Sequence, residues 1–239
     1  MTVIGRALGD PADPIRAVMF TLTIPLTAGA ATIAFMAGAM AAAGFSMKVV
    51  TLVSGYLGCF VVPAYYILAQ GVFAYAVGKY LTKHFRESVG MLSTLQHYYS
   101  EWTTESTEAV LRMAIEEGRK LGEKDRSIQW GVLSVATAGL AFPFFMWSVN
   151  RDVQVHERLE SAAITALMRD LGVSDPWVET ELRPRVGNRG AFVYVVLPFL
   201  FGLLNFLAAY GAAKDLRAHV RFHEKVESLL YGEGTGSGG

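Results

Sequence analysis

Two histidines near the C-terminal end of the chain stand four residues apart, at His219 and His223, and Glu227 follows after another four. An α-helix completes a turn about every 3.6 residues, so this spacing places the three side chains on one face. Imidazole and carboxylate groups are ligands that zinc and related divalent metals accept in proteins. His84, in a similar stretch earlier in the chain, is the fourth candidate ligand. A divalent metal cofactor is therefore one hypothesis, and simple interfacial histidines are the alternative.

Gln70 and Asn205 are the strongly polar side chains that lie well inside long uncharged segments. Each precedes a lysine, Lys79 or Lys214, by nine residues, which is about 13 Å along a helix. In a membrane helix both amides would therefore lie close to the midplane of the bilayer. Amides at that depth usually form hydrogen bonds between helices. The alternative is that they line a path for a small uncharged solute.

Signatures of common enzymes are absent from the sequence. His156 and Glu157 begin a pattern typical of zinc proteases, but Glu160 occupies the position where that pattern needs its second histidine. There is no GxSxG, Walker or GxGxxG motif. No charged residue or histidine lies inside the long uncharged segments, which argues against proton pumps, ion-coupled carriers and voltage sensors. The sequence favours a non-enzymatic role.

Four uncharged runs are long enough to cross the hydrocarbon core of a bilayer, which takes about 20 residues. They are residues 17–47, 49–78, 127–150 and 190–213. The 239-residue chain is 52% hydrophobic, and its 21 basic and 21 acidic residues balance, so no electrostatic argument for binding nucleic acid exists. We expect an all-α integral membrane protein with four transmembrane helices.

An internal repeat relates the second run to the fourth at an offset of 135 residues, with eight identities in 24 positions. The matched pairs are Pro63/Pro198, Leu68/Leu203, Ala74/Ala209, Tyr75/Tyr210, Lys79/Lys214, Leu81/Leu216, His84/His219 and Arg86/Arg221. The first and third runs match at an offset of 110, around Thr27–Gly29 and Thr137–Gly139. This pattern predicts two parallel-repeat hairpins related by an axis along the membrane normal. A rival match, 156–161 with 223–228, would put the copies on opposite membrane faces, and we interpret it as coincidence.

The predicted domain organisation follows from these runs. It consists of an N-terminal segment 1–16, a first hairpin repeat with a helical extension 17–99, a helix 100–126, a second repeat 127–230 and a flexible tail 231–239. The second repeat contains an outer helical insert, 151–189, and a helical extension, 214–230. With this topology 14 Lys and Arg residues lie on one side of the membrane and 7 on the other. The richer side is expected to be cytoplasmic, with both termini in it.

Two further sets of residues are expected to act at surfaces. Small residues in the first run would let another helix approach closely, and basic residues at the ends of the repeated helices would contact lipid head groups. The helix-packing set is Gly29, Ala34, Gly38 and Ala42. The lipid-contacting set is Lys79, Lys83, Arg86, Lys214, Arg217 and Arg221.

The leading functional hypothesis is a non-catalytic subunit of a membrane complex, acting in assembly, as a scaffold or as an accessory protein. Its expected partners are the lipid bilayer and either further copies of the chain or other membrane subunits. One alternative is a pore or carrier lined by Gln70 and Asn205. The other is a juxtamembrane metal-binding protein.

Overall fold

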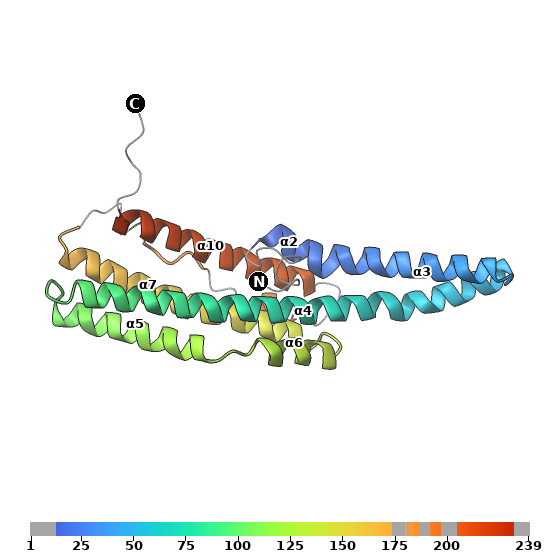
Figure 1. The fold of residues 1–239 in the computed structure, drawn as a ribbon, viewed down its shortest axis with the longest axis horizontal. Helices are drawn as coiled ribbons and strands as arrows, with labels where there is room; N and C mark the ends of the chain where they lie inside the picture. The colour runs from blue at the N-terminus through green and yellow to red at the C-terminus, as the bar shows by residue number, and fades with distance from the viewer. Residues whose placement is uncertain (1–12, 174–179, 181, 187–191, 197–204, 232–239) are drawn as a thin grey trace, which may run out of the picture.

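The computed structural model describes residues 13–173, 180, 182–186, 192–196 and 205–231, and every regular element among them is a helix (Figure 1). The predicted all-α class is therefore confirmed for this part of the chain. In chain order the elements are α2 (Pro14–Val18), η1 (Met19–Thr23), α3 (Ile24–Ala42), α4 (Met47–Tyr98), α5 (Glu105–Glu123), α6 (Ser127–Ala136), α7 (Ala141–Asp170), η2 (Phe192–Val196) and α10 (Asn205–Tyr231).

The first helical stretch, Pro14–Ala42, and helix α4 form an antiparallel hairpin that projects beyond the rest of the molecule (Figure 1). Asp13 caps the start of the stretch by accepting a hydrogen bond from the amide of Ile15. The link between the two helices turns at Gly44, whose φ of 83° is a conformation that glycine adopts without strain. Both helices are long and apolar enough to cross a membrane.

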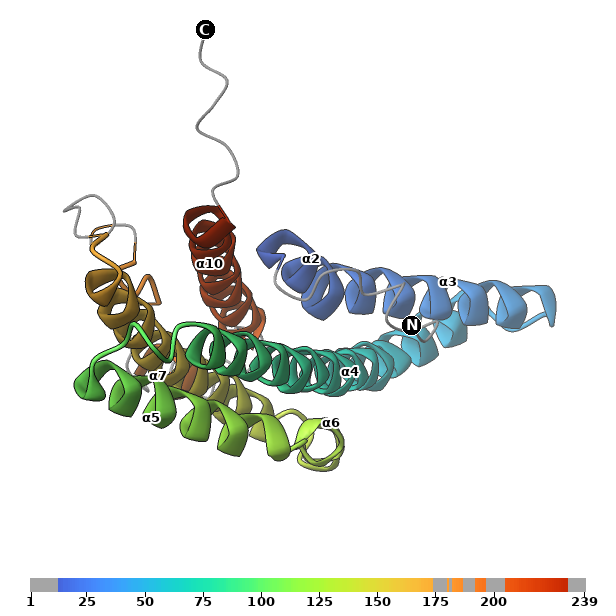
Figure 2. The ribbon, with the colours of Figure 1, turned by 60° about the vertical axis from the view of Figure 1, so that its left-hand side comes forward.

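Helix α4 continues without a break from this apolar hairpin into a polar bundle. Its second half lies beside α5, α7 and α10 (Figures 1 and 2). The bundle has its own apolar core, which includes Leu92, Leu111, Ile164 and Phe222. α5 begins at an N-cap, Thr104, and runs antiparallel to α4. The candidate functional residues lie at this end of the molecule.

The predicted third span, 127–150, is not one helix. α6 ends at Ala136, and the chain reverses over the next four residues before α7 begins. Gly139 makes the reversal possible, because its φ is 88° and a Cβ atom there would lie only 2.5 Å from Oε1 of Gln70. Pro143 produces no kink, since it stands in the first turn of α7, where a proline removes no helical hydrogen bond.

This reversal also corrects the predicted position of the insert 151–189. Residues 151–170 belong to α7, which packs mainly against α5 and α10 and also contacts α4 inside the bundle. They therefore do not lie on the opposite side of the molecule from the extensions of α4 and α10. The sequence match at an offset of 110 does not reflect equal structure, since Thr27–Gly29 are helical whereas Thr137–Gly139 lie in the turn.

The predicted fourth span, 190–213, is described only in part, as η2 and the beginning of α10. Tyr194 of η2 donates a hydrogen bond to Asp215, whereas Asn205 at the start of α10 bonds to Gln70. Tyr194 and Asp215 therefore lie side by side, whereas Asn205 lies beside Gln70, closer to the apolar part of α4. Some predicted segments lie partly outside the described residues. They are the N-terminal segment up to residue 12, parts of the insert from residue 174 onward, and the tail from residue 232.

Candidate metal centre

Four histidines converge between α4, α7 and α10. His84 comes from α4, His156 from α7, and His219 and His223 from α10. One nitrogen of each ring lies within 4.8 Å of one nitrogen of every other. The chain has five histidines, so this point gathers all except His97. Such convergence from three helices is not expected of histidines that merely mark a membrane interface.

A buried carboxylate completes the group. Oε2 of Glu160 lies 3.1 Å from Nε2 of His223 and 3.5 Å from Nε2 of His156. The Nε2 atom of His219 lies 4.0 Å from the same oxygen. The Glu160 side chain is 0% exposed. We refer to His84, His156, Glu160, His219 and His223 as the five-donor cluster.

Several distances within the cluster match the spacing of ligands around one metal ion. Donors about 2.1 Å from a shared centre, at angles between octahedral and tetrahedral values, are roughly 3.0–3.4 Å apart. Nε2 of His219 lies 2.9 Å from that of His84 and 3.3 Å from that of His223. The carboxylate contacts of Glu160 with His223 and His156 fall close to the same range.

Local helical geometry explains how the sequence builds the cluster. His156 and Glu160 are four residues apart on α7, as are His219 and His223 on α10, so each pair lies on one helix face. Helices α4, α7 and α10 run in the same direction, because contacts between two parallel helices join residues at a nearly constant separation along the chain. The separation is 135 residues in both bonded pairs of α4 and α10, and 63–65 residues between α7 and α10. The two pairs and His84 therefore meet at the same height.

Polar neighbours hold the cluster in place. Oγ of Ser88 donates a hydrogen bond of 2.7 Å to Oε1 of Glu160, which leaves Oε2 directed at the histidines. Oε2 of Glu157 accepts a hydrogen bond from the amide of Val186, and its Oε1 lies 3.7 Å from Nδ1 of His219. A carboxylate on the far nitrogen of a metal-binding histidine fixes the ring and its tautomer. Glu157 has the position for that role.

Two donors of the cluster are buried and make no hydrogen bond of good geometry, although each lies within 3.5 Å of another member of the cluster. They are Nε2 of His156 and Oε2 of Glu160. A buried polar atom left in this state costs about 1–3 kcal/mol, and most such atoms in folded proteins are satisfied. Both belong to the five-donor cluster, so a single cation among the donors would satisfy them together.

Burial favours the uncharged form of the cluster's imidazoles. It lowers the pKa of His84 to about 2, with further lowering by the neighbouring histidines. Burial also lowers the pKa of His156 to about 4, against the opposing effect of Glu160. Burial by itself would raise the pKa of Glu160, but His223, whose Nε2 lies 3.1 Å from the carboxylate, and the other histidines hold it below its usual range. Neutral imidazoles and an ionised carboxylate are the forms that bind metals.

The structure brings together three of the four predicted metal ligands, His84, His219 and His223. Glu227 lies in the α10 backbone, but its side chain is outside the described part of the structure. His156 and Glu160 were missed, because the predicted topology put them across the membrane. The signal was present, since both pairs have the four-residue spacing and segment 156–161 resembles 223–228.

The two amides predicted from the sequence to lie near the midplane, Gln70 and Asn205, are in contact. Nδ2 of Asn205 donates a hydrogen bond of 3.2 Å to Oε1 of Gln70, and both residues are buried. This pair, like His84 and His219, has the offset of 135 residues found in the sequence. The amides bond to each other between α4 and α10.

The expected surface residues divide between protein contacts and exposure. Among the basic residues, Lys79 bonds to Asp125 and Arg86 donates to the carbonyl of Gly122. Lys83 and Arg217 lie near Glu87 and Asp13, at 3.4 and 3.9 Å, and Lys214 and Arg221 are exposed.

The small residues of α3 divide in the same way. Gly29 is buried, and a Cβ atom there would lie 2.7 Å from a methyl group of Val62. Ala34, Gly38 and Ala42 are exposed and face away from α4. Within the described part of the chain, close approach by another helix is therefore seen at Gly29, the first member of the predicted packing set.

Comparison of the chain with models of known protein families, with curated proteins and with solved structures finds no match.

Proposed function

We propose that the protein is a membrane-embedded metal-binding protein whose helical bundle holds one divalent transition-metal ion near the membrane surface. The observation that carries this proposal is the convergence of five donor atoms from three helices, two of them buried and without a hydrogen bond of good geometry. A purely structural cluster of this composition would leave those atoms at a cost that a metal ion removes.

The donor set favours particular metals. Imidazole suits zinc, copper, iron and nickel, and an added carboxylate disfavours copper(I), which prefers sulfur. No sulfur ligand is present in the five-donor cluster. Zinc is the first metal to test, because it accepts nitrogen and oxygen ligands of this kind without a strong geometric preference.

Charge distribution supports a membrane location for the hairpin. Lys48, at its tip, is the only charged residue between Arg16 and Lys79. The large apolar side chains along it, including Phe35, Leu52 and Phe60, are mostly exposed in the monomer. Lipid that covers these side chains would remove their contact with water.

The turn between α6 and α7 suggests a topology with two full spans and a re-entrant hairpin. α6 has ten residues, too few to cross a bilayer, and its turn meets Gln70 of α4. In this topology the apolar runs 127–150 and 190–213 each enter and leave the membrane on the same side. Of the 21 basic residues, 20 then lie on that side and Lys48 alone lies on the other. This contrast is stronger than the one the four-span topology gives, and it assigns the bundle and both termini to the cytoplasm.

A second candidate function is an accessory subunit, which the exposed face of α3 favours. Ala34, Gly38 and Ala42 leave a smooth strip on which a helix of another subunit would pack. Cross-linking through cysteines placed at Gly38 would test this role in native membranes. The two functions are compatible, since the strip lies on α3 of the projecting hairpin and the cluster lies between α4, α7 and α10.

Metal analysis of the purified protein tests the main proposal. The detergent-solubilised full chain is loaded with Zn²⁺, dialysed and assayed by elemental analysis. We expect about one zinc per chain, and a loss of at least roughly tenfold in affinity in the His219→Ala, His223→Ala double variant, since removing even outer-shell partners costs 10–100-fold. His97→Ala is the matched control, because that histidine lies outside the cluster.

A milder variant separates lost ligands from lost folding. Glu160→Gln keeps the size of the side chain and removes its charge, so it should weaken zinc binding while size-exclusion behaviour and helicity stay unchanged. Undiminished zinc content in both the double variant and Glu160→Gln would show that the five-donor cluster is not the metal site.

A further inference from the structure

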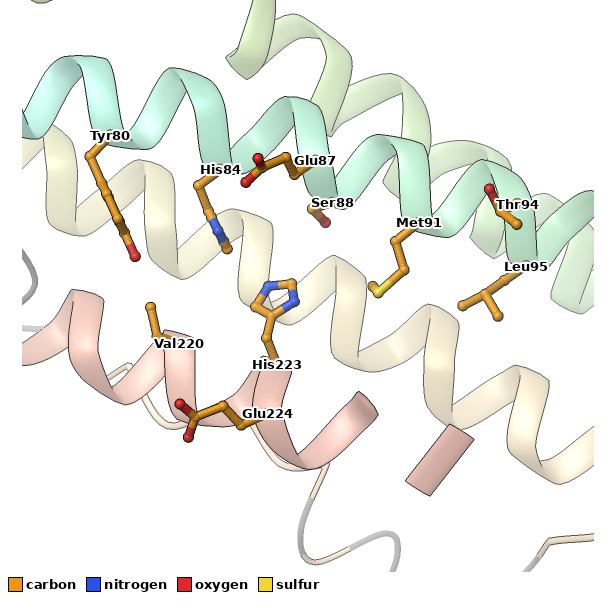
Figure 3. Close-up of a pocket in the computed structure, with 10 residues that line it drawn as sticks. All are labelled: Tyr80, His84, Glu87, Ser88, Met91, Thr94, Leu95, Val220, His223 and Glu224. Carbon is orange, nitrogen blue, oxygen red and sulfur yellow. The ribbon is translucent and has the colours of Figure 1, made fainter. Parts of the chain in front are cut away.

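A cavity of about 440 Å³ opens beside the five-donor cluster, between α4 and α10 (Figure 3). Helix α4 contributes most of its wall and α10 the remainder. The residues that line it are Tyr80, His84, Glu87, Ser88, Met91, Thr94, Leu95, Val220, His223 and Glu224. The cavity is therefore large enough for a small organic molecule as well as water.

Two of the cluster's histidines form part of the cavity wall. His84 and His223 extend toward each other from facing helices, and both are partly exposed (Figure 3). The other two, His156 and His219, are buried at 2% and 1% exposure and do not line the cavity. The cluster is thus closed on the α7 side and accessible on one edge.

This one-sided access matters for the coordination of a metal. Structural metal sites are usually enclosed by protein ligands, whereas sites that exchange ligands keep a position open to solvent. Ser88 joins the two environments, since its side chain lines the cavity and also holds Glu160. A metal in the cluster would have protein donors behind it and a solvent-accessible cavity in front.

We propose that this cavity is the binding site for an exogenous ligand, a small nitrogen- or oxygen-donor molecule that coordinates the metal between His84 and His223. This inference rests on the proposed metal-binding function. Water occupies the position when no other donor is bound.

The cavity wall indicates which donors fit best. Met91, Leu95 and Val220 provide apolar surface, and Glu87 and Glu224 stand on facing helices as acidic groups. No lysine or arginine is among the lining residues that the structure describes. Carboxylates repel anions and tolerate neutral molecules, so an uncharged donor is favoured over an anionic one.

Cobalt provides a spectroscopic test with the full-length protein in detergent. Co²⁺ replaces Zn²⁺, and its visible absorption is followed while imidazole, a neutral donor, or azide, an anionic one, is added. We expect saturable spectral changes with imidazole, at least about tenfold tighter binding of imidazole than of azide, and unchanged cobalt content throughout. Tighter binding of azide would overturn the assignment to uncharged donors.

Filling the cavity should block the ligand and spare the metal. Met91→Trp places a large ring in the cavity, and Met113→Trp makes the same substitution at an exposed position of α5. Met91→Trp should bind cobalt with wild-type stoichiometry and lose the imidazole response at least tenfold, while Met113→Trp keeps it. Val220→Phe provides a second, smaller obstruction if Met91→Trp misfolds.

The outcomes distinguish the two proposals. Cobalt binding without any spectral response to imidazole would refute the open coordination position and leave the metal site intact. An equal response in wild type, Met91→Trp and Val220→Phe would show that imidazole reaches the metal by another route, and would refute the role of the cavity. Absence of cobalt binding in the wild type would refute both proposals.

Discussion

The two halves of α4 have opposite surroundings, although no break separates them. In the part of the first half that projects with α3 beyond the bundle, Leu52 is 66% exposed and Phe60 is 68% exposed (Figure 1). In the second half Phe85 is 3% exposed and Leu92 is 0% exposed. Apolar side chains are thus uncovered at one end and fully covered by protein at the other.

The candidate metal-binding residues lie beside the covered half of α4. The five-donor cluster lies in the covered half, where three helices supply its side chains. A cluster of buried donors needs surrounding protein to exclude water and hold the donors at fixed positions. The hairpin, with two helices, has no such interior.

A continuous helix also fixes the distance between the two regions. From Phe60 to His84 the helix advances about 36 Å at 1.5 Å per residue. If lipid covers the first half, the cluster stands just outside the hydrocarbon core. The contrast in exposure therefore suggests a metal site held at the membrane surface by the helix that anchors it.

The largest expected effect concerns which side of the membrane each region occupies. In a Cys59→Ser background, single cysteines replace Phe45 at the hairpin tip, Met113 on α5 or Val155 on α7, all of which are exposed. A membrane-impermeant maleimide applied to intact cells should label the Phe45 position alone. After the membrane is opened, all three should react.

The Val155 position decides between the two topologies. The four-span arrangement expected from the sequence puts it on the same side as Phe45, and the re-entrant arrangement puts it with Met113. Labelling of Phe45 and Val155 together in intact cells would therefore contradict the topology we propose.

Glycine-to-alanine substitutions should distinguish the two regions by a smaller effect, a difference in stability. A Cβ atom at Gly71 would lie 2.4 Å from a methyl group of Val135 and 3.0 Å from the carbonyl of Gly131, whereas one at Gly38 would meet nothing within 4 Å. We expect Gly71→Ala to destabilise the protein by about 1–3 kcal/mol through overpacking. Gly38→Ala should be neutral or stabilising by up to about 1 kcal/mol, since alanine favours helix.

Thermal unfolding in detergent, followed by circular dichroism, measures the difference between these two glycine variants. Equal melting temperatures would show that α6 does not pack closely on α4 and would remove support for the re-entrant hairpin. A fall for Gly38→Ala alone would indicate that the exposed face of α3 contacts another subunit.

The helical class and the long apolar hairpin could be predicted from the sequence, because uncharged runs and helix spacing are local properties. The pairs Gln70/Asn205 and His84/His219 could be found for a related reason. Both have the same separation along the chain, and parallel helices in register bring such residues together.

The turn near Gly139 was harder to predict, and one error followed from it. Residues 127–150 are uncharged along their whole length, so hydrophobicity alone predicts a single membrane span. The reversal depends on the positive φ of Ala138 and Gly139 and on the fit of Gly139 against Gln70, which are tertiary features. Treating the segment as a full span moved His156 and Glu160 to the wrong side and hid two of the five donors.

The smallest expected effect concerns the junction between the two regions, where Lys79 and Asp125 join α4 to the start of α6. Nζ of Lys79 donates a hydrogen bond of 2.5 Å to Asp125, and the amide and hydroxyl of Ser127 also donate to that carboxylate. The hydrogen bond from Lys79, followed by that from Ser127, lowers the pKa of Asp125 from 3.8 to about 2. Both members of the ion pair are partly exposed, so solvent and salt weaken it.

The direction of the pH effect follows from the lowered pKa. Asp125 stabilises the folded state fully above its ordinary pKa of 3.8, and the contribution disappears as the pH falls toward about 2. Asp125→Asn should therefore lower the melting temperature by roughly 1–3 °C at pH 6, and the gap to wild type should narrow between pH 4 and pH 2. Other carboxylates titrate in both proteins, so the gap between the two curves is the relevant quantity. A gap that stays constant over this range, or one that 1 M NaCl leaves unchanged at pH 6, would mean that the ion pair does not help to hold α6 against α4, and that packing at Gly71 and Gly139 holds it alone.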